Sequence, residues 1–391
     1  MSEHQPKRFT RVTCAPTLAQ YLKVELEQLG FECLSMDKTG VEIKASTSDA
    51  MILNLQLRTA FHVLQRFADI NCRNAEELYS EAKRLPWDRV IDPNGYLSIT
   101  SNVNNPTITN SMFPNMRLKD AICDKLVDAV GKRPDAGSKQ DGMMVHMHWR
   151  ENKARIYINM SGRKLSDRGY RKMPFMAPMR ETIAASVLME MGYTGAKPLV
   201  VPMCGSGTLA IEAALMAKQR APGLLRSGYA CNHILGASDD DWRKARADAK
   251  KLMLKNAPAP IIASDIEEEA IEATRKNAVT AGVDHLIEFH VCDFAETPFP
   301  DSTGDIILHG EYGVRLGDDS LIETYNRMGD FFKQQCAGWT GYVFTSGKPL
   351  IAAMKLKVSK RTPFTNAEID CRLLKYELYA GSRDPKAASS S

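Results

Sequence analysis

The chain has 391 residues, which is enough for two or three domains that each bury a core of their own. Hydrophobic residues make up 44% of it and charged residues 25%, as in ordinary globular proteins, and no apolar run approaches the ~20 residues that span a membrane. The net charge of +4 is only mildly basic, so the overall charge does not indicate nucleic-acid binding, and any basic surface must be local.

Cysteine and histidine spacing argues against a metal site. The nine cysteines are scattered and form no Cys-x-x-Cys pair, so we expect free thiols rather than a zinc site or a disulfide framework. His146 and His148 share one strand face, but the sequence offers no third ligand beside them, which favours a structural role. The N-terminal segment is polar and lacks the apolar core of a signal peptide, so we predict a cytoplasmic location.

The first part of the chain alternates short helices and strands. Thr17 precedes an apolar-periodic segment that stops at Gly30, which predicts a capped helix. Two short strands are expected at residues 31–34 and 40–45, and a long helix at 49–68. The further expected elements are a helix at 71–85 after Asn74, a strand at 96–103, a helix at 113–130 and a hairpin of 143–149 with 154–160. This order predicts α+β packing on an antiparallel sheet.

Residues 161–175 are polar, basic and rich in turn-forming residues, which indicates a linker. A helix at 180–191 follows, and the pattern then changes to strand–helix alternation, which predicts a doubly wound, mainly parallel sheet. The expected elements of that sheet are 198–203, 208–219, 261–266, 267–281, 286–292, 305–309, 319–337 and 340–346. We interpret residues 220–258 as an insertion and predict an antiparallel edge strand at 369–379.

The stretch Val201–Thr208 joins a predicted strand to a predicted helix through two glycines. This layout is typical of a nucleotide-type cofactor site, because glycines admit close backbone approach and a helix N-terminus offers free N–H groups. About sixty residues later, Asp265 ends a second predicted strand, where a carboxylate can hold both ribose hydroxyls. That spacing is too long for the dinucleotide fingerprint, whose acid follows after ~20 residues. A helix N-cap is the alternative role for Asp265.

The chain contains four separate motifs, each made of segments that lie close in the sequence. They are residues 108–124 with 133–134, 161–171 with 177–184, 202–209 with 211–213, and 264–266 with 277–278 and 281–283. In this combination the chain resembles the THUMP-domain RNA methyltransferases, in particular the bacterial group related to the 23S rRNA guanine-N2 methyltransferase. The first group resembles the core of a THUMP domain, and the second resembles the family's entry to the methyltransferase domain. The third resembles its cofactor loop, and the fourth its ribose-binding region.

The resemblance implies an α/β fold in which a Rossmann-like class I methyltransferase domain follows an α+β ferredoxin-like and THUMP module. We expect the RNA-binding module at residues 1–165 and the methyltransferase domain at 166–391. The implied cofactor is S-adenosylmethionine, with its ribose on Asp265 and its adenine amine on Asp293; a turn acid is the alternative role for Asp293. The expected cofactor contacts are Met203, Cys204, Gly205, Gly207, Thr208, Asp265, Ile266, Asp293 and Phe294.

The resemblance also places the catalytic loop at residues 309–313, where family members usually carry Asn-Pro-Pro-Tyr-Gly. Methyl transfer to a base amine needs an acceptor that orients the nitrogen lone pair and an aromatic ring that stacks on an extruded base. We therefore expect His309 and Glu311 as acceptors and Tyr312 as the stacking ring. Gly310 stands where the family has a rigid proline, so the loop is less preorganised.

The basic linker supplies the expected RNA contacts. Its cations could follow RNA phosphates or form an ordinary solvated linker. These residues are Arg163, Lys164, Arg168, Arg171 and Lys172. The implied partner is structured RNA, expected to be ribosomal, and the expected reaction is methyl transfer to guanine N2 of 23S rRNA.

Two alternatives stay open. Val201 stands where family members usually have an Asp that could hold the cofactor's ammonium group. Together with the altered loop at His309, this loss supports the alternative of a protein that binds RNA or assists ribosome assembly but does not catalyse the reaction. The intact glycine turn and the Asp265 region argue against that alternative. Adenine N6 methylation would use the same loop chemistry as guanine N2 methylation. The sequence gives neither the exact target nucleotide nor the oligomeric state.

Overall fold

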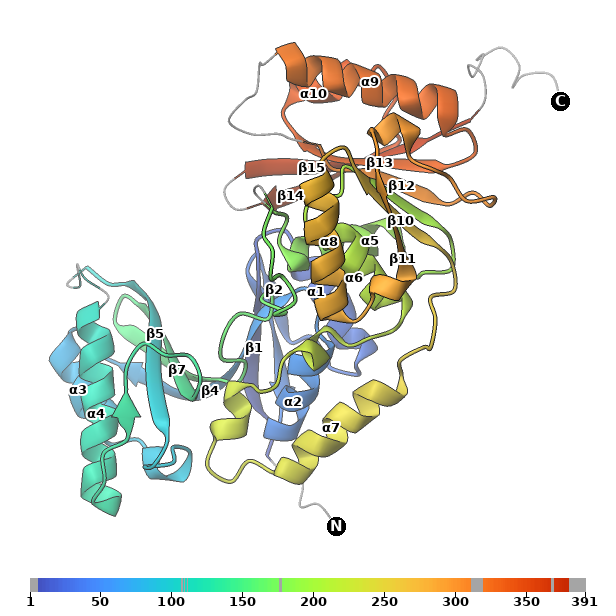
Figure 1. Cartoon of the computed structure of the whole chain (residues 1–391). Coiled ribbons are helices and arrows are strands. Elements are labelled where there is room, and N and C mark those ends of the chain that lie inside the picture. The colour runs from blue at the N-terminus through green and yellow to red at the C-terminus, as the bar shows by residue number, and fades with distance from the viewer. Residues whose placement is uncertain are drawn as a thin grey trace. The chain divides into compact units, whose positions relative to one another are not determined.

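The computed structural model describes residues 6–106, 108, 110, 112–175, 178–310, 319–366 and 369–379. The chain forms two compact units. Unit 1 comprises Met1–Arg168 and Ala221–Leu252, and unit 2 comprises Gly169–Arg220 and Met253–Ser391 (Figure 1). Within the described ranges, no helix combines the length and the apolar composition that crossing a membrane requires.

Unit 1 is a mixed α/β unit. Its strands are β1 (Arg8–Cys14), β2 (Ser35–Asp37), β3 (Gly40–Ala45), β4 (Ala60–Asn71), β5 (Tyr96–Asn104), β6 (Asp135–Ala136), β7 (Met143–Arg150) and β8 (Lys153–Asn159). Its helices are α1 (Ala19–Gln28), α2 (Thr47–Gln56), α3 (Ala75–Lys83), α4 (Met112–Val130) and α7 (Asp239–Lys251), with the short helical turns η1 (Trp87–Arg89), η2 (Pro222–Leu225) and η3 (Ala230–His233). Helices α3 and α4 pack side by side (Figure 1).

The strands of unit 1 form one eight-stranded sheet in the order β2-β3-β1-β4-β8-β7-β5-β6. The long strand β4 connects its two halves, because the beginning of β4 pairs with β1 and its end pairs with β8, both antiparallel. The expected antiparallel sheet is correct for most pairs, but β5 runs parallel to both β6 and β7.

The predicted helix at 49–68 is wrong in its second half. A capping box between Ser46 and Asp49 starts α2, which ends at Gln56, and the chain then re-enters the sheet as β4. The buried carboxylate of Glu25 stabilises the turn by accepting the N–H groups of Arg58 at 2.7 Å and Thr59 at 3.0 Å. The apolar residues of this segment fit both the helical and the strand periodicity. A local sequence pattern cannot reveal the distant contact with Glu25.

Three smaller predictions in unit 1 also need correction. Thr17 does not cap α1: the N-cap is Leu18, and no side chain caps the helix. Residues 31–34 are not a strand, since β2 begins at Ser35. Strand β1 was not expected at all, although Val12 and Cys14 alternate with more polar neighbours. The helix expected after Asn74 is present as α3, and Asn74 caps it by accepting the N–H groups of residues 76 and 77.

The insertion belongs to unit 1, which the sequence did not indicate. Residues 221–252 follow α6 in the chain but pack on the N-terminal part through contacts of α7 and η2 with α2. Ser48 donates to Asp241 at 2.7 Å, and the backbones of Ile91 and Ile234 form an isolated antiparallel bridge. The insertion thus contacts α2 and the segment before β5, which are far apart in the sequence of unit 1.

Unit 2 alternates strands and helices. Its strands are β9 (Leu199–Pro202), β10 (Ile261–Asp265), β11 (Ile287–Val291), β12 (Asp305–Leu308), β13 (Thr340–Ser346), β14 (Lys360–Asn366) and β15 (Ile369–Glu377). Its helices are α5 (Glu181–Met191), α6 (Thr208–Ala217), α8 (Glu268–Ala281), α9 (Asp319–Gln335) and α10 (Lys348–Ala353), with the short turns η4 (Asp284–Leu286) and η5 (Phe294–Glu296). In chain order, each strand and α-helix of unit 2 from α5 to β13 lies where the sequence predicted it to within about two residues, and α10 was not predicted.

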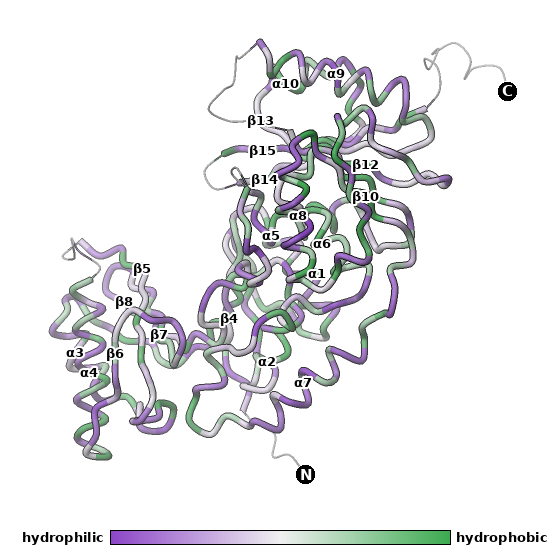
Figure 2. The backbone as a smooth tube through the Cα atoms, viewed as in Figure 1, coloured by the Kyte–Doolittle hydropathy of each residue, from purple (hydrophilic) through white to green (hydrophobic). Residues whose placement is uncertain are grey.

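Over the residues that the structure describes, the sheet of unit 2 has seven strands in the order β11-β10-β9-β12-β13-β15-β14. The first five run parallel, which confirms the doubly wound prediction. Val200, Ile262 and Ile306 pack with residues of α9 and α10, whereas α6 and α8 contact β10 and β11. Because Ile262 and its neighbours along β10 point to opposite faces, the helices cover both sides of the sheet. Figure 2 shows hydrophobic colour along β10 and β12.

The C-terminal strand is antiparallel but is not the sheet edge. Strand β15 pairs with β13 as predicted, and β14 pairs with the other side of β15 and occupies the edge. The sequence of β14, with Pro363 and alternating polar residues, suits an edge because proline cannot donate to a second neighbour.

We expect the free energy of unfolding of unit 1 to fall as the pH is lowered from about 6.5 to about 4. Burial lowers the pKa of His62 and of His146 from the ordinary 6.5 to about 4. In this window the unfolded chain binds protons that the folded state excludes, so acid favours unfolding. Urea titrations across the window measure the effect.

The matched variants are His62→Asn and, as the control, His233→Asn at an exposed position of the insertion. The first should flatten the pH dependence, and the second should leave it unchanged. A wild-type stability that stays constant across the window contradicts the prediction.

Candidate cofactor and catalytic site

The turn between β9 and α6 has an unusual backbone. Met203, Gly205 and Gly207 all adopt positive φ angles, of 56°, 57° and 82° respectively. Gly207 is the left-handed N-cap of α6, and no side chain caps this helix start. The strain at Met203, a residue with a side chain, is typical of a site that a fold holds for function.

The two glycines serve different purposes. A Cβ at Gly207 would lie 2.4 Å from Cγ2 and 2.9 Å from Oγ1 of Thr274 on α8, so only glycine allows the helix to approach. A Cβ at Gly205 would meet no atom of the residues that the structure describes within 4 Å. The loop therefore packs tightly on its α8 side and presents open space at Gly205, where a ligand can approach the backbone.

Asp265 joins this loop to the end of the neighbouring strand. Its Oδ2 accepts the Gly205 N–H at 2.9 Å, and its Oδ1 accepts the Glu267 N–H at 3.1 Å. Ser264 contributes its carbonyl, which accepts the Cys204 N–H at 3.0 Å. The carboxylate thus lies beside the glycine turn, as the sequence analysis expected. The alternative N-cap role does not match, because the N-cap of α8 is Glu267 and no side chain caps it.

The residues after the two strand ends differ in exposure. Ile266 is 63% exposed, which is unusual for an isoleucine next to a buried strand and leaves an apolar surface beside Asp265. Phe294 is buried and packs edge-on against Phe331 with ring centroids 5.6 Å apart. Ile266 is therefore placed for contact with a flat apolar ligand group, whereas Phe294 belongs to the core.

Asp293 follows β11 and caps η5. Its Oδ1 accepts the Ala295 N–H at 3.0 Å, and its Oδ2 accepts a guanidinium N–H of Arg327 at 2.8 Å. Burial opposes ionisation of Asp293, but these two donors hold its pKa below the usual range. The turn-acid role is thus present in the structure, and contact with a ligand amine remains a prediction.

Cys204 and Thr208 of this loop are not placed as reactive groups. Burial raises the pKa of the Cys204 thiol to about 12, so Cys204 stays protonated at neutral pH. Thr208 is buried in the first turn of α6. Val201 is fully buried in β9, opposite Ala263 of β10, so this strand places no carboxylate at the position where the family usually has one.

His309 and Gly310 follow β12 at the same end of the sheet. Burial lowers the pKa of His309 to about 4, so its imidazole is neutral at physiological pH and able to accept a hydrogen bond. A Cβ at Gly310 would lie 2.7 Å from Cε of Met328 and 3.6 Å from Cε of Met203. Methionine side chains thus fill the space that a proline ring would need. Glu311 and Tyr312 lie outside the described residues.

The cations of the basic linker differ in how far they are exposed to solvent. Arg163 pairs with Asp167 at 3.0 Å and is 53% exposed, and Lys164 lies 5.1 Å from the ring centroid of Phe61. Arg168 is buried and donates to the backbone carbonyls of residues 165 and 58. Its donors point into the protein, so its predicted contact with RNA phosphates is not supported by its position.

The remaining two linker cations belong to the segment that bonds to the glycine turn. Lys172 is exposed, whereas Arg171 bonds the Ser206 hydroxyl at 2.9 Å and the Glu181 carboxylate at 2.8 Å. Sequence reasoning missed this contact and the role of Thr274, whose hydroxyl donates to the Gly205 carbonyl at 2.7 Å. The spacing of Thr274 one turn before the motif residue Asn277 was the available signal.

The strand histidine His146 contacts other side chains of the unit 1 sheet. His146 Nδ1 lies 2.9 Å from the Thr100 hydroxyl, and its ring is near Tyr157. Among the described residues, no group of three or more His, Cys, Asp or Glu side chains could hold a metal ion.

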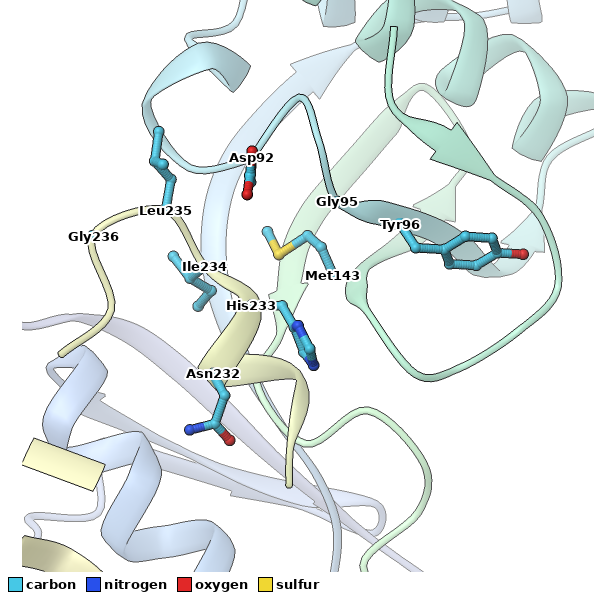
Figure 3. A pocket seen from close by; sticks show the side chains of 9 residues that line it. All are labelled: Asp92, Gly95, Tyr96, Met143, Asn232, His233, Ile234, Leu235 and Gly236. Atoms are coloured by element: carbon cyan, nitrogen blue, oxygen red, sulfur yellow. The ribbon is translucent and has the colours of Figure 1, made fainter. Parts of the chain in front are cut away.

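Unit 1 holds a separate cavity of about 270 Å³. Figure 3 shows Asp92 and Tyr96 on one side and His233 and Ile234 of the insertion on the other. The nine lining residues include no lysine or arginine and none of the predicted site residues. This cavity is therefore distinct from the glycine loop and does not favour phosphate.

Comparisons with known proteins agree with this geometry. Residues 168–375, more than half of the chain, match the family described as RMKL-like, methyltransferase domain. Residues 72–159 match the THUMP domain, and residues 11–64 match the RlmL ferredoxin-like domain.

Relatives and solved structures extend the likeness. A candidate RNA methyltransferase of Synechocystis is 32% identical over 94% of this chain and 96% of its own length. The ribosomal RNA large subunit methyltransferase K/L of Photobacterium profundum is 32% identical over 93% of this chain, which spans only 52% of that relative. A candidate methyltransferase solved with S-adenosylhomocysteine superposes with a TM-score of 0.86 over 97% of this chain and 100% of its own, at 23% identity, which establishes the fold alone.

We expect Gly207→Ala to destabilise unit 2 by roughly 2 to 4 kcal/mol, which sums a left-handed backbone penalty and the overpacking against Thr274. Urea unfolding measures the loss. Adding Thr274→Ser removes the closest methyl group and keeps the hydroxyl, so the double variant should recover part of the stability. A Gly207→Ala protein as stable as the wild type would show that the helix approach is not constrained.

Proposed function

The chain belongs to the family of RMKL-like methyltransferase domains, and from this premise we propose that it transfers a methyl group from S-adenosylmethionine to a base amine in RNA. The observation that carries the proposal is the glycine turn bonded to Asp265 at the ends of β9 and β10. Ligands of open α/β sheets bind in this region, outside the carboxyl ends of the strands.

The residues present fit the cofactor. The open space at Gly205 admits a close backbone contact, and the Asp265 carboxylate lies beside it to accept ribose hydroxyls. The exposed Ile266 offers an apolar surface for the adenine ring. When bound, S-adenosylmethionine supplies the methyl group as an electrophilic carbon on sulfur. Met203, Cys204, Gly207 and Thr208 complete the proposed cofactor loop, and Asp293 follows β11.

We place the reacting base next to His309. The exocyclic nitrogen of a base is a weak nucleophile, so the site must hold its hydrogens and orient its lone pair. A neutral imidazole accepts such a hydrogen, and the depressed pKa of His309 keeps the ring neutral. Glu311 as a second acceptor and Tyr312 as the stacking ring remain part of the proposal on the family resemblance.

The substrate we propose is structured ribosomal RNA, with guanine N2 of the 23S rRNA as the target. The THUMP and ferredoxin-like matches in unit 1 support an RNA substrate, as do the names of the K/L relatives. We propose that residues 1–165 dock the RNA and residues 166–391 carry the reaction. Arg163, Lys164 and Lys172 are the linker cations whose positions suit phosphate contacts.

The first test is calorimetric titration with S-adenosylmethionine. Asp265→Asn should weaken binding about 10- to 100-fold, the loss expected when charge-assisted hydrogen bonds disappear from a site. The matched control is Asp284→Asn, an exposed carboxylate of the same unit that lies in η4, away from the glycine turn. Equal affinity of wild type and Asp265→Asn would remove Asp265 from the site.

The second test is transfer of labelled methyl groups to ribosomal RNA that lacks its natural modifications. We expect label on guanine N2 and at least a tenfold slower reaction for His309→Ala, the lower end of the range for a positioning or acid–base group. Label on adenine N6 would replace the proposed base. Binding of RNA and cofactor without any transfer would contradict the enzyme proposal and favour a role in RNA binding or ribosome assembly.

A further inference from the structure

Arg171 makes a set of contacts that does not suit an RNA-facing cation. Its Nη1 donates to the Ser206 hydroxyl at 2.9 Å, and its Nη2 donates to Oε1 of Glu181 at 2.8 Å and to the Met179 carbonyl at 3.0 Å. Its Nε donates to the same carboxylate oxygen at 3.2 Å. The side chains of Arg171 and Glu181 are only 17% and 12% exposed, so the pair is largely withdrawn from solvent.

Asn277 of α8 fixes the same segment from the other side. Its Oδ1 accepts the N–H groups of Lys172 at 2.8 Å and Met173 at 3.0 Å. Its Nδ2 donates to the carbonyls of Met173 at 2.8 Å and Ser206 at 3.2 Å. Asn277 is fully buried, and both its donors and both its acceptor positions are used. Arg171 and Asn277 therefore meet at Ser206.

Ser206 is the residue between the two glycines of the cofactor loop. Gly205 and Gly207 have positive φ angles and little intrinsic preference for one conformation, so this turn needs bonds from outside to remain in place. Its side chain is held by Arg171 and its carbonyl by Asn277. The segment at Arg171–Met173 thus supports the turn at Ser206, the residue between its two glycines.

We propose that Arg171 is a positioning residue for the cofactor loop and not an RNA contact. The guanidinium holds Ser206 relative to Glu181, and this contact keeps the Gly205 N–H and the open space beside it in the binding conformation. Only arginine has a planar fork of donors that reaches a hydroxyl, a carboxylate and a carbonyl at once. The inference rests on the proposed function, because it requires that the cofactor binds at this loop.

The experiment is calorimetric titration of the full-length chain with S-adenosylhomocysteine. Arg171→Lys keeps the positive charge but loses the fork, and we expect it to weaken binding about 10-fold or more. Ser206→Ala removes the accepting hydroxyl with little change in volume and should cause a similar loss. In the double variant the second change should add almost nothing, because both remove the same contact. Arg180→Ala, at an exposed cation nearby, is the control and should bind like the wild type.

Two further readouts separate positioning from other roles. The melting temperature of Ser206→Ala should stay within about 3 °C of the wild type while its affinity for the cofactor falls. A merely structural role would give the opposite result, a lower melting temperature without a matching loss of affinity. The salt dependence of RNA binding should be unchanged in Arg171→Lys and smaller in Lys172→Ala, which removes an exposed cation.

The outcomes are distinguishable. Wild-type affinity in both Arg171→Lys and Ser206→Ala overturns the positioning role and leaves the proposed function intact. Failure of the wild type to bind S-adenosylhomocysteine overturns both. If Arg171→Lys weakens RNA binding by a larger factor than it weakens cofactor binding, Arg171 is an RNA contact and this inference is overturned.

Discussion

The hydrogen bond from the Gly205 N–H to the Asp265 carboxylate is the contact on which the site depends. It joins the ends of two adjacent parallel strands, β9 and β10, at the edge where ligands of open α/β sheets bind. Thr274 supports the loop from α8 through its bond to the Gly205 carbonyl, and it packs so closely on Gly207 that no side chain fits there. These constraints leave Gly205 as the open position of the turn.

Much of the candidate site could be predicted because its parts are local in sequence. The glycine turn and the acid at the next strand end are short motifs whose chemistry follows from residue type, as for Gly205 and Asp265. The contacts that hold the turn could not be predicted in the same way. Thr274 and Arg171 act over 69 and 35 residues of chain, and a basic residue in a polar linker has the same local pattern whether it faces RNA or an internal carboxylate.

The helices and strands of unit 2 could be predicted more accurately than those of unit 1, because unit 1 depends more on contacts between distant residues. The buried parallel strands of unit 2 are short apolar runs between clear helices, and the predicted alternation was confirmed there. In unit 1 the segment 57–64 carries apolar residues that suit either a helix or a strand. Its strand conformation is accompanied by distant contacts, namely pairing with β1 and β8 and the bonds of Glu25 to Arg58 and Thr59. The packing of residues 221–252 on α2 is equally non-local.

A crystal structure of the protein with S-adenosylhomocysteine tests the central claim most directly. The account predicts the ribose hydroxyls on the Asp265 carboxylate, the methionine portion over Gly205 and the adenine ring against Ile266, with the glycine turn unchanged. A ligand bound elsewhere, or a turn that must rearrange away from Asp265 to admit it, would contradict the claim that these contacts build the cofactor site in advance.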